Sequence, residues 1–204
     1  MKRRTLRLVL ACAAIVLAAG CSSSQPGSAA ASPTPPASPT PAPPSPTAAP
    51  PPPTGAPAGT GRCLAPGLRL DVGDIGAAAG NRYLSISFTN TSGSACWLYG
   101  FPGMLMLDAS GRAMPTRVVR AGPAMFATID ATPRVVTLGQ GASAPFFLHY
   151  GVVPSGSETS CPESSQVLVT PPDETRQLRT DLRIAPCQGG TIDVSPVEPP
   201  GTHL

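Results

Sequence analysis

The sequence has few of the residues that enzymes and nucleic-acid-binding proteins rely on. It contains two histidines and one tryptophan, and its one lysine, Lys2, belongs to a basic cluster at the start of the chain. Beyond residue 20, ten arginines are balanced by eleven acids, so the remaining chain is close to neutral. A near-neutral chain without lysine lacks the basic patch that binds nucleic acid. We therefore expect no nucleic-acid partner.

Motifs of catalysis and metal binding are also missing. The chain has no Gly-x-Ser-x-Gly sequence, no Cys-x-x-Cys sequence, and no acid at a recognisable spacing from His149. His149 stands in the apolar run Phe-Phe-Leu-His-Tyr, where a histidine with a structural hydrogen bond is more common than a general base. We predict no catalytic residue, no metal and no cofactor. A hydrolase that uses His149 as its base is the alternative.

The methionines suggest a copper site, although a simpler explanation exists. Met104 and Met106 would share one face of a strand, and Met114, Met125 and His149 would add further ligands. Leucines flank these methionines, however, and methionine fills the gaps of an apolar core well. We therefore prefer a core strand to a copper-handling protein.

Three arginines, Arg117, Arg120 and Arg134, would form a small anion-binding patch if they met on one face. Long charged side chains more often lie along a solvated surface, with their stems on apolar neighbours and their heads in water. We predict that solvated arrangement here.

No apolar run reaches the ~20 residues that a membrane-spanning helix needs. The run over residues 8–19 follows four basic residues between Lys2 and Arg7, and it precedes a small residue, Gly20. A basic start, a short apolar core and small residues at its end are the parts of a secretory signal peptide. We predict a signal peptide over residues 1–20.

The signal ends in Leu-Ala-Ala-Gly-Cys, residues 17–21, which resembles the lipobox of bacterial lipoproteins. By that resemblance, Cys21 receives a diacylglyceryl group on its sulfur and the signal is cut before it. Two or more acyl chains hold a protein at a membrane, whereas a single chain binds only marginally. We expect a protein anchored by lipid at Cys21 on the extracytoplasmic face of the cell membrane.

Residues 21–62 form the lipidated cysteine and a tether. Between residues 22 and 61 every residue except Gln25 is Ser, Thr, Ala, Gly or Pro, and fourteen of the 28 prolines lie here. Such a segment buries too little apolar surface to offset the entropy of ordering, and its proline runs favour extended polyproline II. We predict a disordered spacer that holds the following domain away from the membrane.

Residues 63–204 form one all-β domain. Short alternating apolar segments are separated by Gly, Pro, Asp or Ser, and no helical period runs for three turns. Seven to nine strands at this spacing predict an immunoglobulin-like antiparallel β-sandwich. The candidate strands cover residues 68–72, 84–89, 96–99, 104–107, 125–129, 135–138, 145–150, 167–170 and 191–194.

Four cysteines remain in this domain, and export makes disulfide bonds the default. Three pairings are possible. We favour Cys63–Cys96 and Cys161–Cys187, because each pair then closes one end of the domain. A site that binds metal through four thiolates is the alternative, but no cysteine spacing supports it.

Three features of the domain form a recognisable set: Cys-Trp-Leu-Tyr-Gly-Phe-Pro-Gly at residues 96–103, Phe-Thr-Asn-Thr at 88–91, and the four spaced cysteines. The set resembles an actinobacterial exported family, the domain of unknown function DUF4232, and residues 96–103 are its most specific part. The resemblance covers about residues 63–197. It implies a cell-envelope protein with an immunoglobulin-like sandwich, and it implies no activity. We predict a binding or structural module whose partner is an envelope protein, a glycan or a lipid.

The lipid anchor is tested by Cys21→Ala. This substitution removes the acylated sulfur, so the protein should leave the membrane fraction for the medium, or should keep its signal uncut. Fractionation followed by mass measurement of the N-terminal peptide distinguishes these results. Normal processing with unchanged membrane retention would contradict lipidation.

Overall fold

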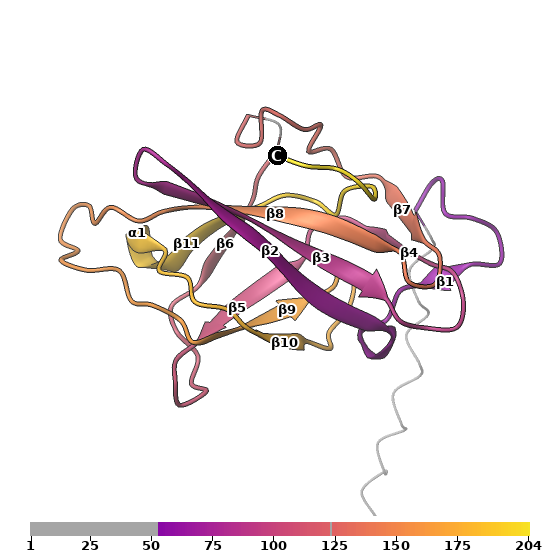
Figure 1. Cartoon of the computed structure of the whole chain (residues 1–204), viewed down its shortest axis with the longest axis horizontal. Helices are drawn as coiled ribbons and strands as arrows, with labels where there is room; N and C mark the ends of the chain where they lie inside the picture. Colours follow the sequence, from indigo (N-terminus) through magenta and orange to yellow (C-terminus); the bar gives the residue numbers. More distant parts are fainter. Residues whose placement is uncertain (1–52, 123) are drawn as a thin grey trace, which may run out of the picture. The chain divides into compact units, whose positions relative to one another are not determined.

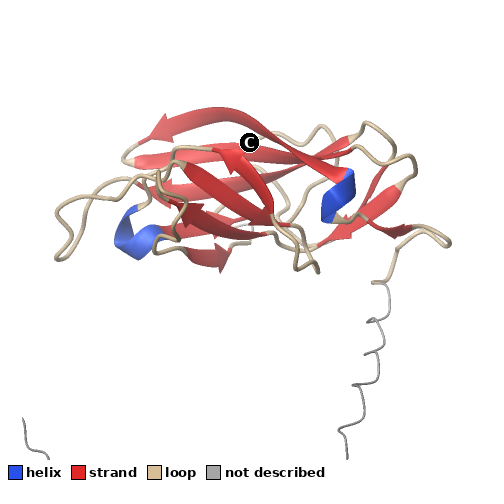
Figure 2. Ribbon diagram, turned by 90° about the horizontal axis from the view of Figure 1, so that it is seen from below, coloured by secondary structure: helices blue, strands red, loops and turns tan. Residues whose placement is uncertain are grey.

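Strands are the main regular structure of the described chain (Figures 1 and 2). The computed structural model describes residues 53–122 and 124–204, so the predicted signal peptide, Cys21 and most of the tether lie outside the described residues. The elements, in chain order, are β1 (Gly61–Arg62), a 3-10 turn (Ala65–Gly67), β2 (Leu68–Ala78), β3 (Asn81–Asn90), β4 (Cys96–Tyr99), β5 (Gly103–Leu107), β6 (Arg117–Arg120), β7 (Val135–Leu138), β8 (Ser143–Gly151), β9 (Gln166–Thr170), β10 (Leu178–Asp181), α1 (Cys187–Gly190) and β11 (Thr191–Val194).

The strands form three sheets that pack as a sandwich, so the all-β sandwich predicted from the sequence is confirmed. The largest sheet has the order β2-β3-β8-β11-β6, and the two smaller sheets have the orders β10-β9-β5 and β1-β4-β7. Most neighbouring strands are antiparallel. Two pairs, β11 with β6 and β1 with β4, are parallel.

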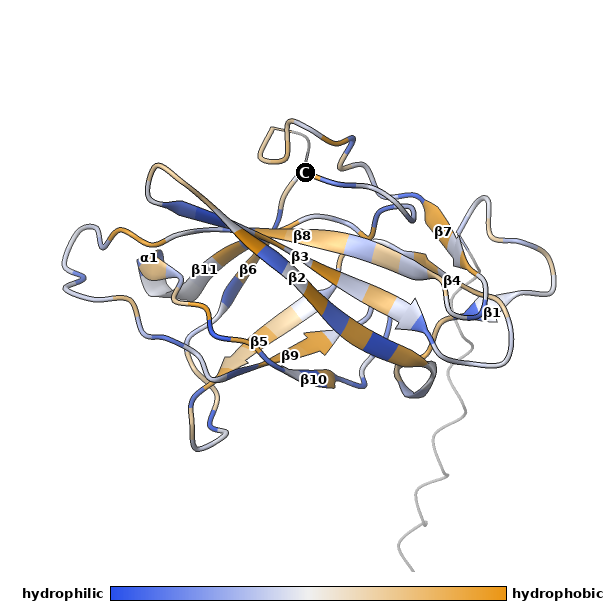
Figure 3. Ribbon diagram, viewed as in Figure 1, coloured by the Kyte–Doolittle hydropathy of each residue, from blue (hydrophilic) through white to orange (hydrophobic). Residues whose placement is uncertain are grey.

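The core forms because apolar residues alternate along the strands, and Figure 3 shows this alternation as bands of colour on β2 and β3. On β3, Leu84, Ile86 and Phe88 are buried, and Phe88 stacks on Phe146 of β8 with the ring centroids 5.2 Å apart. The core also takes residues from both smaller sheets, among them Leu98, Val136, Val167 and Val169.

Eight of the nine predicted strands lie within observed ones, and the prediction for residues 125–129 is wrong. This segment consists of turns, in which the amide of Met125 donates to the carbonyl of Gly122 and that of Ile129 to Phe126. Phe126 is buried in a small separate cluster with Phe147, so its segment is apolar without alternating. Three strands, β1, β6 and β10, were not predicted, because each lies at a sheet edge and contains no buried residue.

The structure joins Cys63 to Cys96 and Cys161 to Cys187, with Cα atoms 4.9 and 4.7 Å apart. This is the pairing that the sequence favoured, and it leaves no thiolate cluster for metal among these four cysteines. The first disulfide fixes the start of the domain against β4. There the indole Nε1 of Trp97 also donates to the carbonyl of Thr60 at 2.9 Å.

Asn90, at the end of β3, connects two turns through its buried amide. Its Nδ2 donates to the carbonyls of Ser94, Leu138 and Gly139 at 2.9–3.2 Å, and its Oδ1 accepts from the amide and hydroxyl of Ser92. The side chain of Asn90 is fully buried, and its hydrogen bond to the carbonyl of Leu138 is buried as well, so water cannot readily replace that donor. The turns after β3 and after β7 are therefore held together by one residue.

We predict that Asn90→Ala lowers the free energy of unfolding by about 2–4 kcal/mol, because it leaves buried carbonyls without a donor. Denaturant unfolding followed by fluorescence of Trp97 measures the change. Asn90→Asp is the matched variant: it keeps the acceptor for Ser92 but places a carboxylate against three carbonyl oxygens, so it should be at least as destabilising. A loss below 0.5 kcal/mol for both variants, within the range of ordinary surface substitutions, would contradict this role.

Candidate functional site

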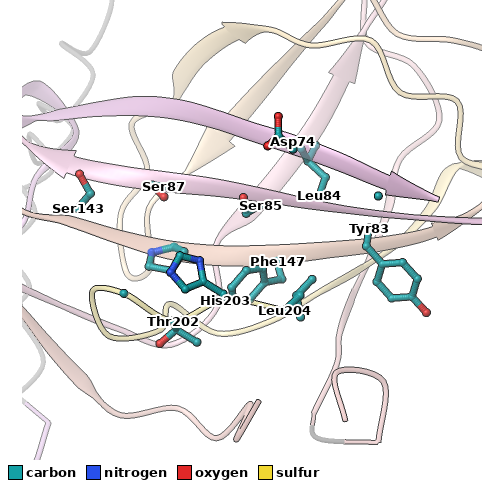
Figure 4. A pocket seen from close by; sticks show the side chains of 13 residues that line it. Asp74, Tyr83, Leu84, Ser85, Ser87, Ser143, Phe147, Thr202, His203 and Leu204 are labelled. Atoms are coloured by element: carbon teal, nitrogen blue, oxygen red, sulfur yellow. The ribbon is translucent and has the colours of Figure 1, made fainter. Parts of the chain in front are cut away.

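A groove lies on the outer face of the five-stranded sheet, between the strands β2, β3 and β8 and the segment over residues 201–204 (Figure 4). Its volume is about 490 Å³. The lining combines hydroxyl groups, two aromatic rings, one carboxylate and one imidazole. The residues are Asp74, Gly76, Tyr83, Leu84, Ser85, Ser87, Ser143, Pro145, Phe147, Gly201, Thr202, His203 and Leu204.

The polar floor of the groove follows from the alternation of β3. Because Leu84 and Ile86 point into the core, Tyr83, Ser85 and Ser87 point outward. The register places Ser85 opposite Phe147 and Ser87 opposite Pro145 on β8. One face of β3 therefore builds the core while the other supplies hydroxyl groups to the groove.

A β-bulge brings a carboxylate to the edge of the groove. The register of β2 with β3 shifts between Val72 and Ile75, so Gly73 and Asp74 together oppose Ser85. A Cβ atom at Gly73 would lie 2.2 Å from the hydroxyl oxygen of Ser85, which explains the glycine. The extra residue turns the side chain of Asp74 toward the groove.

The segment after β11 is fastened to β8 beside the groove. The amide of Ser195 donates to the carbonyl of Phe147, and the hydroxyl of Ser195 accepts from the amide of Phe147, each at 2.9 Å. The amide of Glu198 donates to the carbonyl of Pro145 at 2.7 Å. The turn at Pro199 and Thr202 then leads the chain over the sheet.

Glu198 holds this segment to the loop before β7 through an ion pair with Arg134, whose side chain is partly exposed. Its side chain is 0% exposed, and its Oε2 accepts from Nη2 of Arg134 at 2.9 Å. Its Oε1 has no hydrogen-bond partner among the described residues. Burial raises the pKa of Glu198 above the usual 4.5, and the ion pair with Arg134 opposes part of that rise.

A cluster around His149 lies on the same face. Nδ1 of His149 is 2.9 Å from Oδ2 of Asp193, and Nε2 is 3.1 Å from Oδ1 of Asn81. The Asn81 amide is oriented by its own Nδ2, which donates to the carbonyl of Ala79. The ring of Tyr83 packs against the imidazole with centroids 4.9 Å apart, so the cluster supports one wall of the groove.

In this geometry His149 contacts an acid, Asp193, but no nucleophile. Both ring nitrogens already face an acceptor, and no serine, threonine or cysteine lies within hydrogen-bond distance of them in the part of the chain that the structure describes. A general base needs a free nitrogen directed at the proton it removes. The arrangement is that of a histidine that positions its neighbours.

The methionines and the histidine considered as copper ligands do not come together in the structure. Met104 and Met106 are buried in the core, as preferred from the sequence, and Met114 packs against them. Met125 lies in the exposed turn before β7, and His149 lies on the outer face of the large sheet. Met104 and Met106 therefore fill the interior.

The three arginines considered for an anion patch also point to different partners. Arg120 stacks over the ring of Phe101, and Arg134 pairs with Glu198. Arg117 is exposed at the start of β6. No shared anion-binding surface forms from these three residues.

Glu158, Cys161 and Cys187 come close enough to share a metal ion, but none is free in the oxidised protein. The two sulfur atoms are bonded to each other. The carboxylate of Glu158 accepts from the amides of Gly189 and Gln188 at 2.7 and 2.8 Å, and these bonds lower its pKa. The glutamate thus caps a turn in which Gln188, Gly189 and Gly190 all have positive φ.

Sequence reasoning did not find the groove residues. Neither Asp74 nor His203 belongs to a motif that marks it in the sequence. The one sequence signal for the groove is the alternation on β3, which places Tyr83, Ser85 and Ser87 on an outward polar face. That signal does not show which other residues cover the face.

These features define an all-β sandwich domain with two disulfide bonds and a polar groove on its five-stranded sheet. Residues 63–198 match the family described as the domain of unknown function DUF4232, and the chain belongs to that family. Comparison with curated proteins and with solved structures returned no match. Within residues 53–122 and 124–204, no helix has the length and apolar character needed to cross a membrane.

The raised pKa of Glu198 predicts a pH dependence of stability. Below 4.5 the carboxyl is protonated in both states, and its full contribution to stability is present. As the pH rises from 4.5 through the higher folded-state pKa, the unfolded state loses its proton first, so that contribution is lost. Glu198→Gln cannot ionise and should lack this fall.

Urea unfolding of both proteins between pH 3.5 and 8 measures the difference. The wild type should lose stability relative to Glu198→Gln as the pH rises. Parallel curves for the two proteins would show that Glu198 titrates alike in the folded and unfolded states.

Proposed function

We propose that the chain is an extracytoplasmic binding module of an actinobacterial cell envelope, held at the membrane by lipid on Cys21. On this proposal the groove takes a neutral, hydroxyl-rich ligand, namely an envelope glycan. The signal-like start, the Leu-Ala-Ala-Gly-Cys sequence and the uncharged tether support the location. The residues that line the groove support the choice of a glycan as the ligand.

The polar groups of the groove suit hydroxyl groups of a ligand. Ser85 and Ser87 each offer a hydroxyl that can donate and accept, and Asp74 adds an acceptor. Thr202 donates its hydroxyl proton to the carbonyl of Pro199, and the hydroxyl of Ser143 shares a hydrogen bond with Thr89. No lysine or arginine is among the residues that line it, so the groove holds no strong partner for phosphate or sulfate.

The ring of Tyr83 suits the apolar face of a sugar ring, whereas Phe147 is only 1% exposed and lies under Phe126. Tyr83 lies at the edge of the groove, where His149 holds its ring in place. Aromatic side chains supply rigid contact area with little loss of conformational entropy. The combination of Tyr83 with the row of serines is the observation that carries the proposal.

The size of the groove agrees with a small ligand or a short stretch of a polymer. Ligand sites commonly measure ~300–1,000 Å³, and this groove falls in that range at about 490 Å³. Its open side faces away from the core, so a polymer can pass along it.

We do not extend the proposal to hydrolysis. A hydrolase with His149 as base needs a nucleophile or a water beside Nε2, and Asn81 occupies that position. The copper-handling alternative has no support from the positions of the methionines.

Tyr83→Ala tests the proposed function. Cosedimentation of the full chain with purified cell-wall glycan should show binding, and the substitution should weaken it about tenfold, equivalent to 1.4 kcal/mol. Tyr99→Ala is the matched control, because Tyr99 is an exposed tyrosine on β4 outside the groove. It should bind like the parent.

Equal binding by both variants would show that the glycan contacts a different surface. Binding of the parent to lipid vesicles free of glycan, but not to the glycan, would replace the proposed ligand with a lipid. Circular dichroism of each variant checks that the fold is retained.

A further inference from the structure

Four polar side chains form a continuous series of hydrogen bonds across the outer face of the five-stranded sheet. The carboxylate of Asp71, on β2, accepts from Arg69 through Oδ1. Its Oδ2 accepts from the hydroxyl of Thr89, on β3, at 2.5 Å. The hydroxyl oxygens of Thr89 and Ser143, the first residue of β8, lie 2.7 Å apart. Ser143 lines the groove, so the series ends there (Figure 4).

The strand register brings these side chains together. Arg69 lies opposite Thr89, and Thr89 lies opposite Ser143, so three neighbouring strands supply one residue each at the same level of the sheet. Thr89 and Ser143 point outward, because Phe88 and Ala144, next to them in the sequence, are buried in the core. Thr89 is only 6% exposed, so its two hydrogen bonds form largely away from water.

The partners decide which way each proton points. An ionised carboxylate has no proton to give, so the hydroxyl of Thr89 donates its one proton to Asp71. With that proton used, the oxygen of Thr89 can only accept from Ser143. The proton of Ser143 is therefore directed at Thr89, and its remaining lone pairs are left for the groove. Hydrogen bonds in series polarise one another, which makes this oxygen a better acceptor.

The other lining groups whose protons are assigned are acceptors too. The hydroxyl of Thr202 donates to the carbonyl of Pro199 at 2.9 Å, so its oxygen can only accept from a ligand. The carboxylate of Asp74 accepts only. Lysine, arginine, asparagine, glutamine and tryptophan, the side chains that always carry a donor, are absent from the lining. The groove therefore asks its ligand for donors.

We propose that Asp71 and Thr89 are positioning residues of the groove, which fix Ser143 as an acceptor and thereby select a glycan that presents a free hydroxyl group to it. The choice of ligand rests on the proposed function. The direction of the protons in the series does not depend on any ligand.

The selection works through the proton of the ligand. A sugar hydroxyl that carries a methyl group keeps its oxygen but has no proton, so it cannot donate to Ser143, Thr202 or Asp74. Each of these oxygens would then lose its hydrogen bond to water without gaining one from the ligand. Leaving acceptors unpaired should weaken binding about tenfold, equivalent to 1.4 kcal/mol.

Neutron diffraction tests the direction of the series without a ligand. In crystals of the full chain grown in heavy water, deuterium on Ser143 should lie between its oxygen and that of Thr89. Deuterium on Thr89 should point to Asp71. Deuterium on Ser143 directed into the groove would overturn the inference.

Asp71→Asn tests the selection, because it should reverse the series. Arg69 donates to Oδ1, so the new amide should keep its oxygen on that side and turn its nitrogen to Thr89. Thr89 would then donate to Ser143, and Ser143 would donate into the groove. Cosedimentation with purified cell-wall glycan and with the same glycan after O-methylation measures the effect. The parent chain should prefer the unmodified glycan about tenfold, and Asp71→Asn should lose most of that preference.

Thr89→Val gives a second variant in case the first does not fold. It removes the partner of the Ser143 proton, which can then turn to the groove, so the preference should fall here as well. Asp181→Asn is the matched control, because Asp181 is an exposed aspartate at the end of β10 outside the groove. It should keep the parent's preference.

Two results separate this inference from the proposed function. A parent chain that binds both glycans equally, or variants that keep its preference, would overturn the selection and leave glycan binding in place. A parent chain that binds neither glycan would overturn the proposed function and the ligand chosen here. The neutron result would still decide the direction of the series.

Discussion

The register of β3 depends on the buried amide of Asn90. β3 lies between β2 and β8, and its last residue fastens the two turns that lead into β4 and β8. A shift of one residue along β3 would turn Leu84, Ile86 and Phe88 outward and Ser85 and Ser87 inward. The hydrogen bonds of Asn90 fit one register only, so the same residue fixes both the core and the floor of the groove.

The two faces of the large sheet are covered differently. The inner face packs against the smaller sheets through a continuous apolar core. The outer face carries hydroxyl groups, with one large apolar exception, Phe147, which is buried by Phe126 and its loop. That local cover leaves the rest of the outer face open, and the groove lies between the covered part and the free edge of β2.

The sequence predicted the parts of the fold that depend on local pattern. Alternation located the central strands, and it placed β4, β7 and β11 at their observed bounds. The edge strands β1, β6 and β10 were not predicted, because an edge strand buries few side chains. Residues 125–129 were wrongly predicted as a strand, because Phe126 is buried from a turn. The groove could not be predicted, because Asp74, Phe147 and His203 meet through strand register, a bulge and the path of the chain after β11.

The Cys63–Cys96 disulfide has a mechanical consequence. A pull on the chain ahead of Gly61 would first meet β1, a strand of two residues. At Cys63 the load passes through a covalent bond into β4, so it cannot open the domain by peeling strands one after another. Forced unfolding is governed by the barrier to the first large opening, and with the disulfide intact the load reaches the hydrogen bonds between β4 and β7. The Cys63–Cys96 disulfide thus carries tension at the point where the chain enters the domain.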